Sequence, residues 1–265
     1  MVTEIDPTHW RTLWISDLHL GSTACSAESL LDFLDHHDAD TLYLVGDIVD
    51  AWHLKRFGHW PRAHNDVVQR ILRRARNGTR VILIPGRRDP FVRDWAGVSF
   101  GDIDIVEEAI HRMACGRRLL VTHGDQFDSR WTTRLAGIYH TVQRWRDERR
   151  NPEAADRASD AREARHQRGR AGYLRQVQHV GLNEVRRRML DGLICGHAHA
   201  PALETVDGLI YGNDGDWVHS LSAIAEDHDG RLSLQYGQPQ ARRLPLSRDA
   251  TRPLAMPALP STLRR

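Results

Sequence analysis

The chain has few cysteines and no long apolar run. Its 265 residues include only Cys25, Cys115 and Cys195, an odd, scattered set that argues against a disulfide framework and favours a reducing compartment. No stretch of about 18 apolar residues suggests a transmembrane helix, and the first residues do not resemble a secretory signal. We therefore expect a cytoplasmic protein in which Cys115 and Cys195, at strand-like positions, are small core residues.

Lysine is almost absent as well. Lys55 is the single lysine among 37 basic residues, and the formal net charge is only +2. Arginine binds phosphate and carboxylate groups in a bidentate manner, but the codon preference of a GC-rich genome would produce the same bias. The arginines are concentrated: residues 130–188 contain fifteen arginines and seven acids, a net charge of 15 − 7 = +8.

Strands and helices alternate in the first third of the chain. Apolar runs predict strands at 12–16, 41–46 and 80–84, and helical spacing predicts helices at 26–36 and 62–76. Such alternation favours an α/β sheet with right-handed crossovers. The second half is strand-rich, with predicted strands at 103–106, 109–113, 118–122, 192–195, 202–206, 209–212, 218–224 and 232–236. We expect two sheets with helices outside.

The Arg-rich region interrupts this pattern. We predict a core domain of residues 1–125 and 191–237, a helical insert at 126–190 and a loose Pro/Arg-rich tail at 238–265. The basic middle of the insert suits an anionic membrane surface or a nucleotide diphosphate, or is simply a solvated face. A nucleic-acid partner is not expected, because aromatic and basic residues do not interleave there.

Five short polar segments lie just after apolar strands. They are Ser16-Asp17-Leu18-His19, Gly46-Asp47-Ile48-Val49-Asp50, Gly86-Arg87-Arg88-Asp89, Thr122-His123-Gly124-Asp125 and Cys195-Gly196-His197-Ala198-His199. The carboxyl ends of strands are where open α/β sheets build their sites. Aspartate and histidine together are ligands for a divalent metal, so the series predicts a metal site.

The order of these segments resembles the calcineurin-like metallophosphoesterase superfamily, whose pattern runs D-x-H, G-D-x-x-D, G-N-H-D, G-H and G-H-x-H. Within it, the segments 123–128, 191–197 and 211–218 are similar to the UDP-2,3-diacylglucosamine pyrophosphohydrolase group. The resemblance covers about residues 11–237. It implies a four-layer α/β/β/α sandwich with an inserted helical cap.

The resemblance also implies a site with two divalent metals, Mn²⁺ by analogy, although iron or Zn²⁺ suits the same ligands. Asp17, His19 and His199 would hold one metal, His123 and His197 the other, and Asp47 would bridge both. Two adjacent cations activate water and stabilise charge on a phosphoryl group. Beyond the ligands, Asp50, Asp89 and Asp125 either orient histidines and backbone or simply form turns.

The third motif departs from the superfamily at two positions. Arg88 replaces its histidine, as in the pyrophosphohydrolase group, where an arginine faces phosphate, so Arg88 is predicted to bind substrate. Arg87 replaces the asparagine that ligates the second metal, and a guanidinium has no lone pair to offer. Three outcomes are open: the second metal is lost or weakened, Arg87 turns outward, or it pairs with Asp47 or the substrate phosphate. We hypothesise weakened affinity for the second metal.

These implications lead to one expected function and two alternatives. The expected function is hydrolysis of the pyrophosphate of UDP-2,3-diacylglucosamine to UMP and a lipid monophosphate, a step of lipid A synthesis, at the inner membrane surface. One alternative is a phosphodiesterase or phosphatase that acts on soluble nucleotides. The other is a binding protein whose catalysis is weakened by Arg87.

Overall fold

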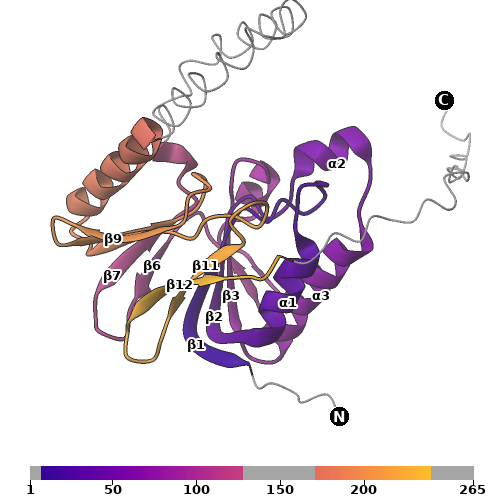
Figure 1. The fold of residues 1–265 in the computed structure, drawn as a ribbon, viewed down its shortest axis with the longest axis horizontal. Coiled ribbons are helices and arrows are strands. Elements are labelled where there is room, and N and C mark those ends of the chain that lie inside the picture. The colour runs from indigo at the N-terminus through magenta and orange to yellow at the C-terminus, as the bar shows by residue number, and fades with distance from the viewer. Residues whose placement is uncertain (1–6, 128–170, 240–265) are drawn as a thin grey trace, which may run out of the picture.

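The computed structural model describes residues 7–127 and 171–239. Two β-sheets pack face to face, with helices on their outer faces (Figure 1). The elements of the first half are β1 (Thr8–Ile15), α1 (Ala27–His36), β2 (His37–Val45), α2 (Ala51–Phe57), α3 (Arg62–Arg76), β3 (Arg80–Ile84), η1 (Pro90–Trp95), β4 (Ser99–Phe100), β5 (Ile103–Ile105), β6 (Ala109–Arg112), β7 (Arg118–Val121) and η2 (Asp125–Phe127). The remaining strands are β8 (Gly192–Cys195), β9 (Ala202–Val206), β10 (Leu209–Asn213), β11 (Ser222–Glu226) and β12 (Leu232–Tyr236).

The larger sheet has the strand order β12-β11-β1-β2-β3-β5-β4, and the smaller one has the order β6-β7-β8-β10-β9. Parallel pairing joins β1, β2, β3 and β5 in the first sheet and β7, β8 and β10 in the second. The carboxyl ends of these parallel strands therefore share one edge of each sheet.

Three apolar clusters separate four layers. The first fills the space between the larger sheet and helices α1 and α3, and includes Leu30, Phe33 and Val67. The second, around Trp14 and Ile194, lies between the sheets. The third packs the smaller sheet against the helical residues 171–187. This arrangement confirms the predicted α/β/β/α sandwich.

The structure bears on the predicted insert only in part. Val177, Leu182 and Val185 of the helical residues 171–187 are buried against the smaller sheet, where they supply the fourth layer. The remainder of the insert, residues 128–170, and the tail from 240 lie outside the described residues, so those boundaries stay predictions. Within the described part of the chain, no helix is both long and apolar enough to cross a bilayer.

Two sequence-based predictions need correction, and one helix was not foreseen. Cys115 is exposed in the β6–β7 turn rather than buried, whereas Cys195 is fully buried in β8 as predicted. The predicted strand 218–224 begins only at Ser222, because the preceding residues form a turn whose N–H groups bond to Asp216. Helix α2 was not predicted, since it buries none of its residues and so has no apolar spacing.

Candidate metal centre

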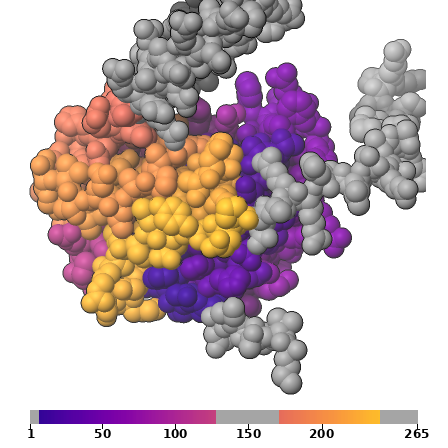
Figure 2. Space-filling view, in the orientation of Figure 1, coloured from indigo at the N-terminus to yellow at the C-terminus, as the bar shows by residue number. Residues whose placement is uncertain are grey.

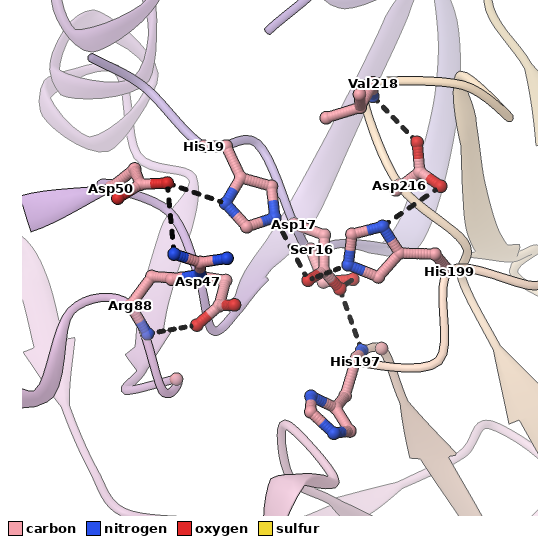
Figure 3. A network of polar contacts seen from close by, with 12 residues as sticks. Ser16, Asp17, His19, Asp47, Asp50, Arg88, His197, His199, Asp216 and Val218 are labelled. Atoms are coloured by element: carbon pink, nitrogen blue, oxygen red, sulfur yellow. Dashed lines mark hydrogen bonds and ion pairs between the residues drawn. The ribbon is translucent and has the colours of Figure 1, made fainter. Parts of the chain in front are cut away.

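The loops that follow the parallel strands of both sheets meet at one end of the sandwich, and each carries predicted site residues. Asp17 and His19 follow β1, Asp47 and Asp50 follow β2, Arg87, Arg88 and Asp89 follow β3, His123 and Asp125 follow β7, and His197 and His199 follow β8. Hydrogen bonds join the loops across the sheets: the His197 N–H donates to Asp17 Oδ2 at 2.8 Å, and His123 Nδ1 lies 2.9 Å from the Val45 carbonyl oxygen. The core of the cluster is drawn in Figure 3.

The backbone is strained where it carries the candidate ligands. Positive φ angles between 50° and 62° occur at Asp17, His19, Asp47, His197 and His199. Residues other than glycine adopt this left-handed conformation at a cost, typically about 1–3 kcal/mol each where the structure enforces it. Hydrogen bonds from the N–H groups of the β1 loop to the carbonyls of Gly46 and Asp47 hold the turns in place. Such concentrated strain is typical of functional sites.

One group of possible ligand atoms consists of Asp17, His19 and His199. Asp17 Oδ1 lies 3.0 Å from His199 Nε2 and 3.6 Å from His19 Nε2, and the two imidazole rings are 5.5 Å apart. The other carboxylate oxygen of Asp17 is held by the hydroxyl of Ser16 at 2.9 Å and by the backbone of His197. Asp17 therefore turns one fixed oxygen toward two histidines (Figure 3).

A second group consists of Asp17, Asp47 and His123, all buried. With Nδ1 beside the Val45 carbonyl, the His123 ring presents Nε2 to the cluster, 3.5 Å from Asp47 Oδ1. Among the described residues, His123 Nε2 is buried without a hydrogen-bond partner, and Asp17 Oδ1 contacts only the two histidines given above. Buried polar atoms in this state are costly unless a ligand completes them. Carboxylate and imidazole donors aimed at a common space fit a divalent metal ion.

The pKa shifts report an environment that favours positive charge. Burial acts to raise the pKa of Asp17, but hydrogen bonds from His19 and His199 outweigh it and hold that pKa well below its usual range. Burial acts to lower the pKa of His123, yet the charges of Asp17, Asp47 and Asp125 leave it raised. His199 behaves likewise: burial is outweighed by Asp17 and Asp216, and its pKa rises to about 10. The same carboxylates that raise the pKa values of these histidines would attract a metal cation to this space.

Two predicted ligand roles differ from what these groups display. Asp17 belongs to both groups, whereas Asp47, the predicted bridge, belongs only to the second. Asp47 Oδ1 accepts a 2.6 Å hydrogen bond from the Arg88 backbone. His197 belongs to neither group, although its ring packs edge-on against His123 with 5.2 Å between centroids. The bridging role of Asp47 and the ligand role of His197 stay predictions.

The two adjacent arginines lie in different surroundings. The Arg88 guanidinium is 3.8 Å from Asp50 Oδ2, and that same oxygen is 3.7 Å from His19 Nδ1. Arg88 thus stands at the rim of the cluster, half-buried, where it can meet an anion (Figure 3). Arg87 is exposed and, within residues 7–127 and 171–239, forms no ion pair or hydrogen bond through its side chain. This exposure is compatible with an outward turn of Arg87, and the choice among the three outcomes stays a prediction.

Asp89 holds the β2 and β3 loops together. Its buried carboxylate accepts N–H bonds from Gly86 at 2.6 Å and from Ile48 at 2.8 Å. Gly86 lies so close to Asp47 that a Cβ atom at position 86 would collide with the backbone and carboxylate of Asp47. The third predicted supporting residue, Asp125, instead pairs with Arg93 at 3.1 Å. Asp89 thus closes a turn at Gly86 and orients the backbone of the β2 loop at Ile48, so both predicted interpretations describe part of its contacts.

Asp216 has no predicted role, although it lies in the segment 211–218 that is similar to the pyrophosphohydrolase group. Asp216 is fully buried, and its Oδ2 lies 3.4 Å from Nδ1 of His199. Its Oδ1 accepts N–H bonds from Val218 at 2.7 Å and Ser220 at 3.2 Å, which fix the carboxylate. A carboxylate behind a histidine orients the ring for a metal on its other nitrogen. The signal was an aspartate just after β10, a strand parallel to β8.

Comparisons with known proteins agree with this arrangement. The family described as calcineurin-like phosphoesterase matches residues 11–201. A protein named UDP-2,3-diacylglucosamine hydrolase from Xanthomonas oryzae pv. oryzae (strain PXO99A) is 30% identical over 257 residues, which cover 84% of this chain and 98% of that protein. The protein of the same name from Bordetella pertussis (strain Tohama I) is 29% identical, covering 74% of this chain and 81% of its own length.

A solved structure of wild-type Vps29 from Entamoeba histolytica complexed with Zn²⁺ matches at a TM-score of 0.43 and 14% identity, covering 84% of this chain and 96% of that one. Calcineurin-like phosphoesterases use divalent metals, and the two ligand groups described above provide donors suited to them. The family match spans the strands β1 to β8 and every candidate ligand from Asp17 to His199. The chain belongs to the calcineurin-like phosphoesterase family.

Proposed function

We propose that this protein hydrolyses the pyrophosphate of UDP-2,3-diacylglucosamine to UMP and a lipid monophosphate. The observation that carries the proposal is the similarity of this chain to proteins named UDP-2,3-diacylglucosamine hydrolase along 98% of their length. A match of this extent includes the regions between the metal motifs, where substrate specificity is built. The reaction would take place in the cytoplasm, at the surface of the inner membrane, as a step of lipid A synthesis.

The residues of the cluster have distinct parts in this proposal. Two divalent cations, Mn²⁺ in our proposal, would lower the pKa of water and neutralise charge on the phosphoryl group. Asp17, Asp47 and His123 would hold one of them, and His19 and His199 would join Asp17 around the other. The Arg88 guanidinium would bind a phosphate oxygen at the rim, since bidentate N–H donors match that group.

Exposed aromatic side chains close to the cluster in the chain suit a substrate with acyl chains. Helix α2 begins directly after Asp50 and projects from the sandwich (Figure 1). Trp52 is 72% exposed and Phe57 61% exposed, and Trp60 follows shortly after the helix. Large aromatic side chains in solvent are costly unless they meet an apolar partner. Residues 128–170 of the predicted helical insert lie outside the described residues.

The test compares substrates that share a phosphate but differ in lipid. Hydrolysis of UDP-2,3-diacylglucosamine, UDP-glucose and bis(p-nitrophenyl) phosphate is measured while Mn²⁺ is titrated. We expect the diacyl substrate to be preferred by at least about 100-fold in kcat/KM, with the preference reduced in a Trp52→Ser variant. Equal rates on UDP-glucose and the diacyl compound would refute the lipid substrate and favour the soluble-nucleotide alternative.

Arg87 supports a second candidate, a protein with weakened catalysis. The position that carries a metal ligand in the family pattern here carries a side chain without a lone pair, turned to solvent. The same assay on Arg87→Asn decides between the two. Activity that appears only in the variant favours the binding protein, whereas activity already present in the native chain favours the enzyme.

A further inference from the structure

Three possible metal ligands also lie far from the candidate metal centre. They are His9 on β1, Asp40 on β2 and His228 in the turn between β11 and β12. His9 Nε2 lies 2.7 Å from Asp40 Oδ1, and His228 Nδ1 lies 3.9 Å from Asp40 Oδ2. The two imidazole rings are stacked nearly parallel, 5.8 Å apart at an angle of 7°. One ligand atom from each residue lies within 4.8 Å of the others.

The backbone beneath these side chains is regular, so their proximity is built into the fold. Parallel pairing sets His9 opposite Asp38, and Asp40, two residues on, points to the same face of the sheet. The turn that carries His228 is fixed by Asp227, whose side chain accepts N–H bonds from Asp229 at 2.9 Å and Arg231 at 2.8 Å. The β11–β12 hairpin lies directly against the first strand in Figure 2.

The charge of Asp40 is not met by a guanidinium, although the chain is rich in arginine. Among the described residues, its ion pairs are with the two histidines only. The nearby arginines are engaged elsewhere: Arg11 with Glu226 at 2.7 Å and Arg231 with Asp229 at 3.1 Å. In the part of the chain that the structure describes, the negative charge of Asp40 therefore lies between two imidazoles and no arginine, an environment that can accept a bound cation.

We propose that His9, Asp40 and His228 bind a divalent transition metal of the Zn²⁺ class. Two imidazoles and one carboxylate are donors that such ions prefer, whereas Mg²⁺ prefers oxygen ligands and retains its water. Metal–ligand bonds of about 2.0–2.1 Å place tetrahedral ligands roughly 3.3 Å apart. The three side chains, each 51–57% exposed, can close to that spacing by rotation, and solvent can supply the fourth ligand.

This site is separate from the candidate metal centre. His9 precedes Asp17 by eight residues of extended chain, which corresponds to about 26 Å at about 3.3 Å per residue. The start of β1 and the β11–β12 turn lie at the lower end of the sandwich in Figure 1, away from α2. A bound ion would link β1, β2 and the hairpin, and would stabilise the folded state increasingly as the free metal concentration rises above the Kd.

The experiment locates zinc directly. The full-length protein is crystallised with Zn²⁺ and, separately, with Mg²⁺, and anomalous scattering is recorded at the zinc edge. We expect a zinc peak between His9, Asp40 and His228, and none there in the Mg²⁺ crystals. In solution, zinc bound after dialysis should fall by one ion per chain in His228→Gln and in Asp40→Asn, and should not change in His179→Gln, an exposed histidine on the helical residues 171–187.

The outcomes concern this site alone. The wild type and the variants share the candidate metal centre, so a difference of one zinc ion between them comes from the second site. A peak at the lower end that disappears in His228→Gln, with an unchanged circular dichroism spectrum, establishes the site. A wild-type zinc content identical to that of both ligand variants would overturn it. So would anomalous density confined to the Asp17 cluster. The melting temperature gives a second measure: Zn²⁺ should raise it more in the wild type than in His228→Gln.

Discussion

Two clusters of buried charged residues lie at different places in the same sandwich, and they are completed to different degrees. Around Asp17 and His123, the buried Nε2 atom of His123 has no hydrogen-bond partner among the described residues, and the backbone is strained. Around Glu226, every carboxylate oxygen is bonded: Oε1 to the Ala114 N–H at 2.7 Å, and Oε2 to Arg11 at 2.7 Å and to His111 at 2.8 Å. Since unmet buried polar groups cost stability, the first cluster is arranged for a ligand and the second for the fold.

The Glu226 cluster also joins the two sheets. Glu226 and Arg11 belong to strands of the larger sheet, whereas His111 is on β6 of the smaller one. Arg11 additionally donates to the Arg112 carbonyl of β6 at 3.0 Å. Burial of Glu226 would raise its pKa, but the bonds from His111 and Ala114 outweigh burial and leave the pKa below its ordinary value. The carboxylate is thus stabilised as an anion.

The largest expected effect is at the incomplete cluster. In Asp17→Asn we expect kcat/KM to fall on the order of 10³-fold, because one oxygen faces both groups of ligand atoms. Asparagine tolerates a positive φ, so unfolding in urea with EDTA should change by less than about 1 kcal/mol. Metal content is measured alongside activity, with the exposed Asp229→Asn as control. Full metal content in Asp17→Asn would contradict the assignment.

The complete cluster should respond in the opposite way. Glu226→Gln should lower the free energy of unfolding by about 2–3 kcal/mol. We expect less than for a fully buried pair, because the Arg11 side chain is 31% exposed and its charge is screened. Activity per folded molecule should be unchanged. Urea denaturation measures the loss, and Glu204→Gln, an exposed glutamate bonded to Gln178, is the matched control. If Glu226→Gln lost activity but kept its stability, Glu226 would serve the active site rather than the fold.

Asp216 combines features of both clusters, since one of its oxygens is bonded and the other faces a ligand. Asp216→Asn keeps an oxygen for the N–H groups of the turn but removes the charge behind His199. We expect metal affinity to weaken about 10–100-fold. Isothermal titration with Mn²⁺ measures it. If the variant weakens only the group of Asp17, His19 and His199, the two Mn²⁺ ions should bind in two distinct steps of the titration, with the weaker step belonging to that group. Equal weakening in the Asp229→Asn control would rule out a specific role.

The sequence predicts the layers better than the contacts within them. Apolar runs located β1, β2, β3 and β8, because buried parallel strands need continuous apolar residues. Helix α2 and the turn after Asp216 escaped prediction, since neither has an apolar period. Because sites form at the carboxyl ends of parallel strands, the sequence predicted that Asp17 and His199 lie close together. No such rule pairs Glu226 with His111, 115 residues apart in the chain, because their contact depends on how the sheets stack.

Acid should weaken the complete cluster further. The pKa of Glu226 is lowered in the folded state, so its stabilising contribution is present above the unfolded pKa of about 4.3 and is lost as the pH falls through the folded value. We therefore expect the wild type to lose more stability than Glu226→Gln between about pH 5 and the folded pKa. Urea midpoints measured at several pH values in EDTA give the difference. Parallel pH dependences would show that Glu226 does not titrate with folding.

The smallest effect is expected at Arg87. Its side chain is exposed and, among the described residues, makes no ion pair with either cluster. Replacing it therefore removes little charge from the site. Asparagine adds one possible ligand oxygen, and we expect Arg87→Asn to tighten the weaker Mn²⁺ site by less than about tenfold. Titration calorimetry against Arg117→Asn, a distant exposed arginine, measures this. Two equally tight Mn²⁺ ions in the native chain would refute the weakened second site, because the incomplete cluster would then hold both ions without a residue-87 ligand.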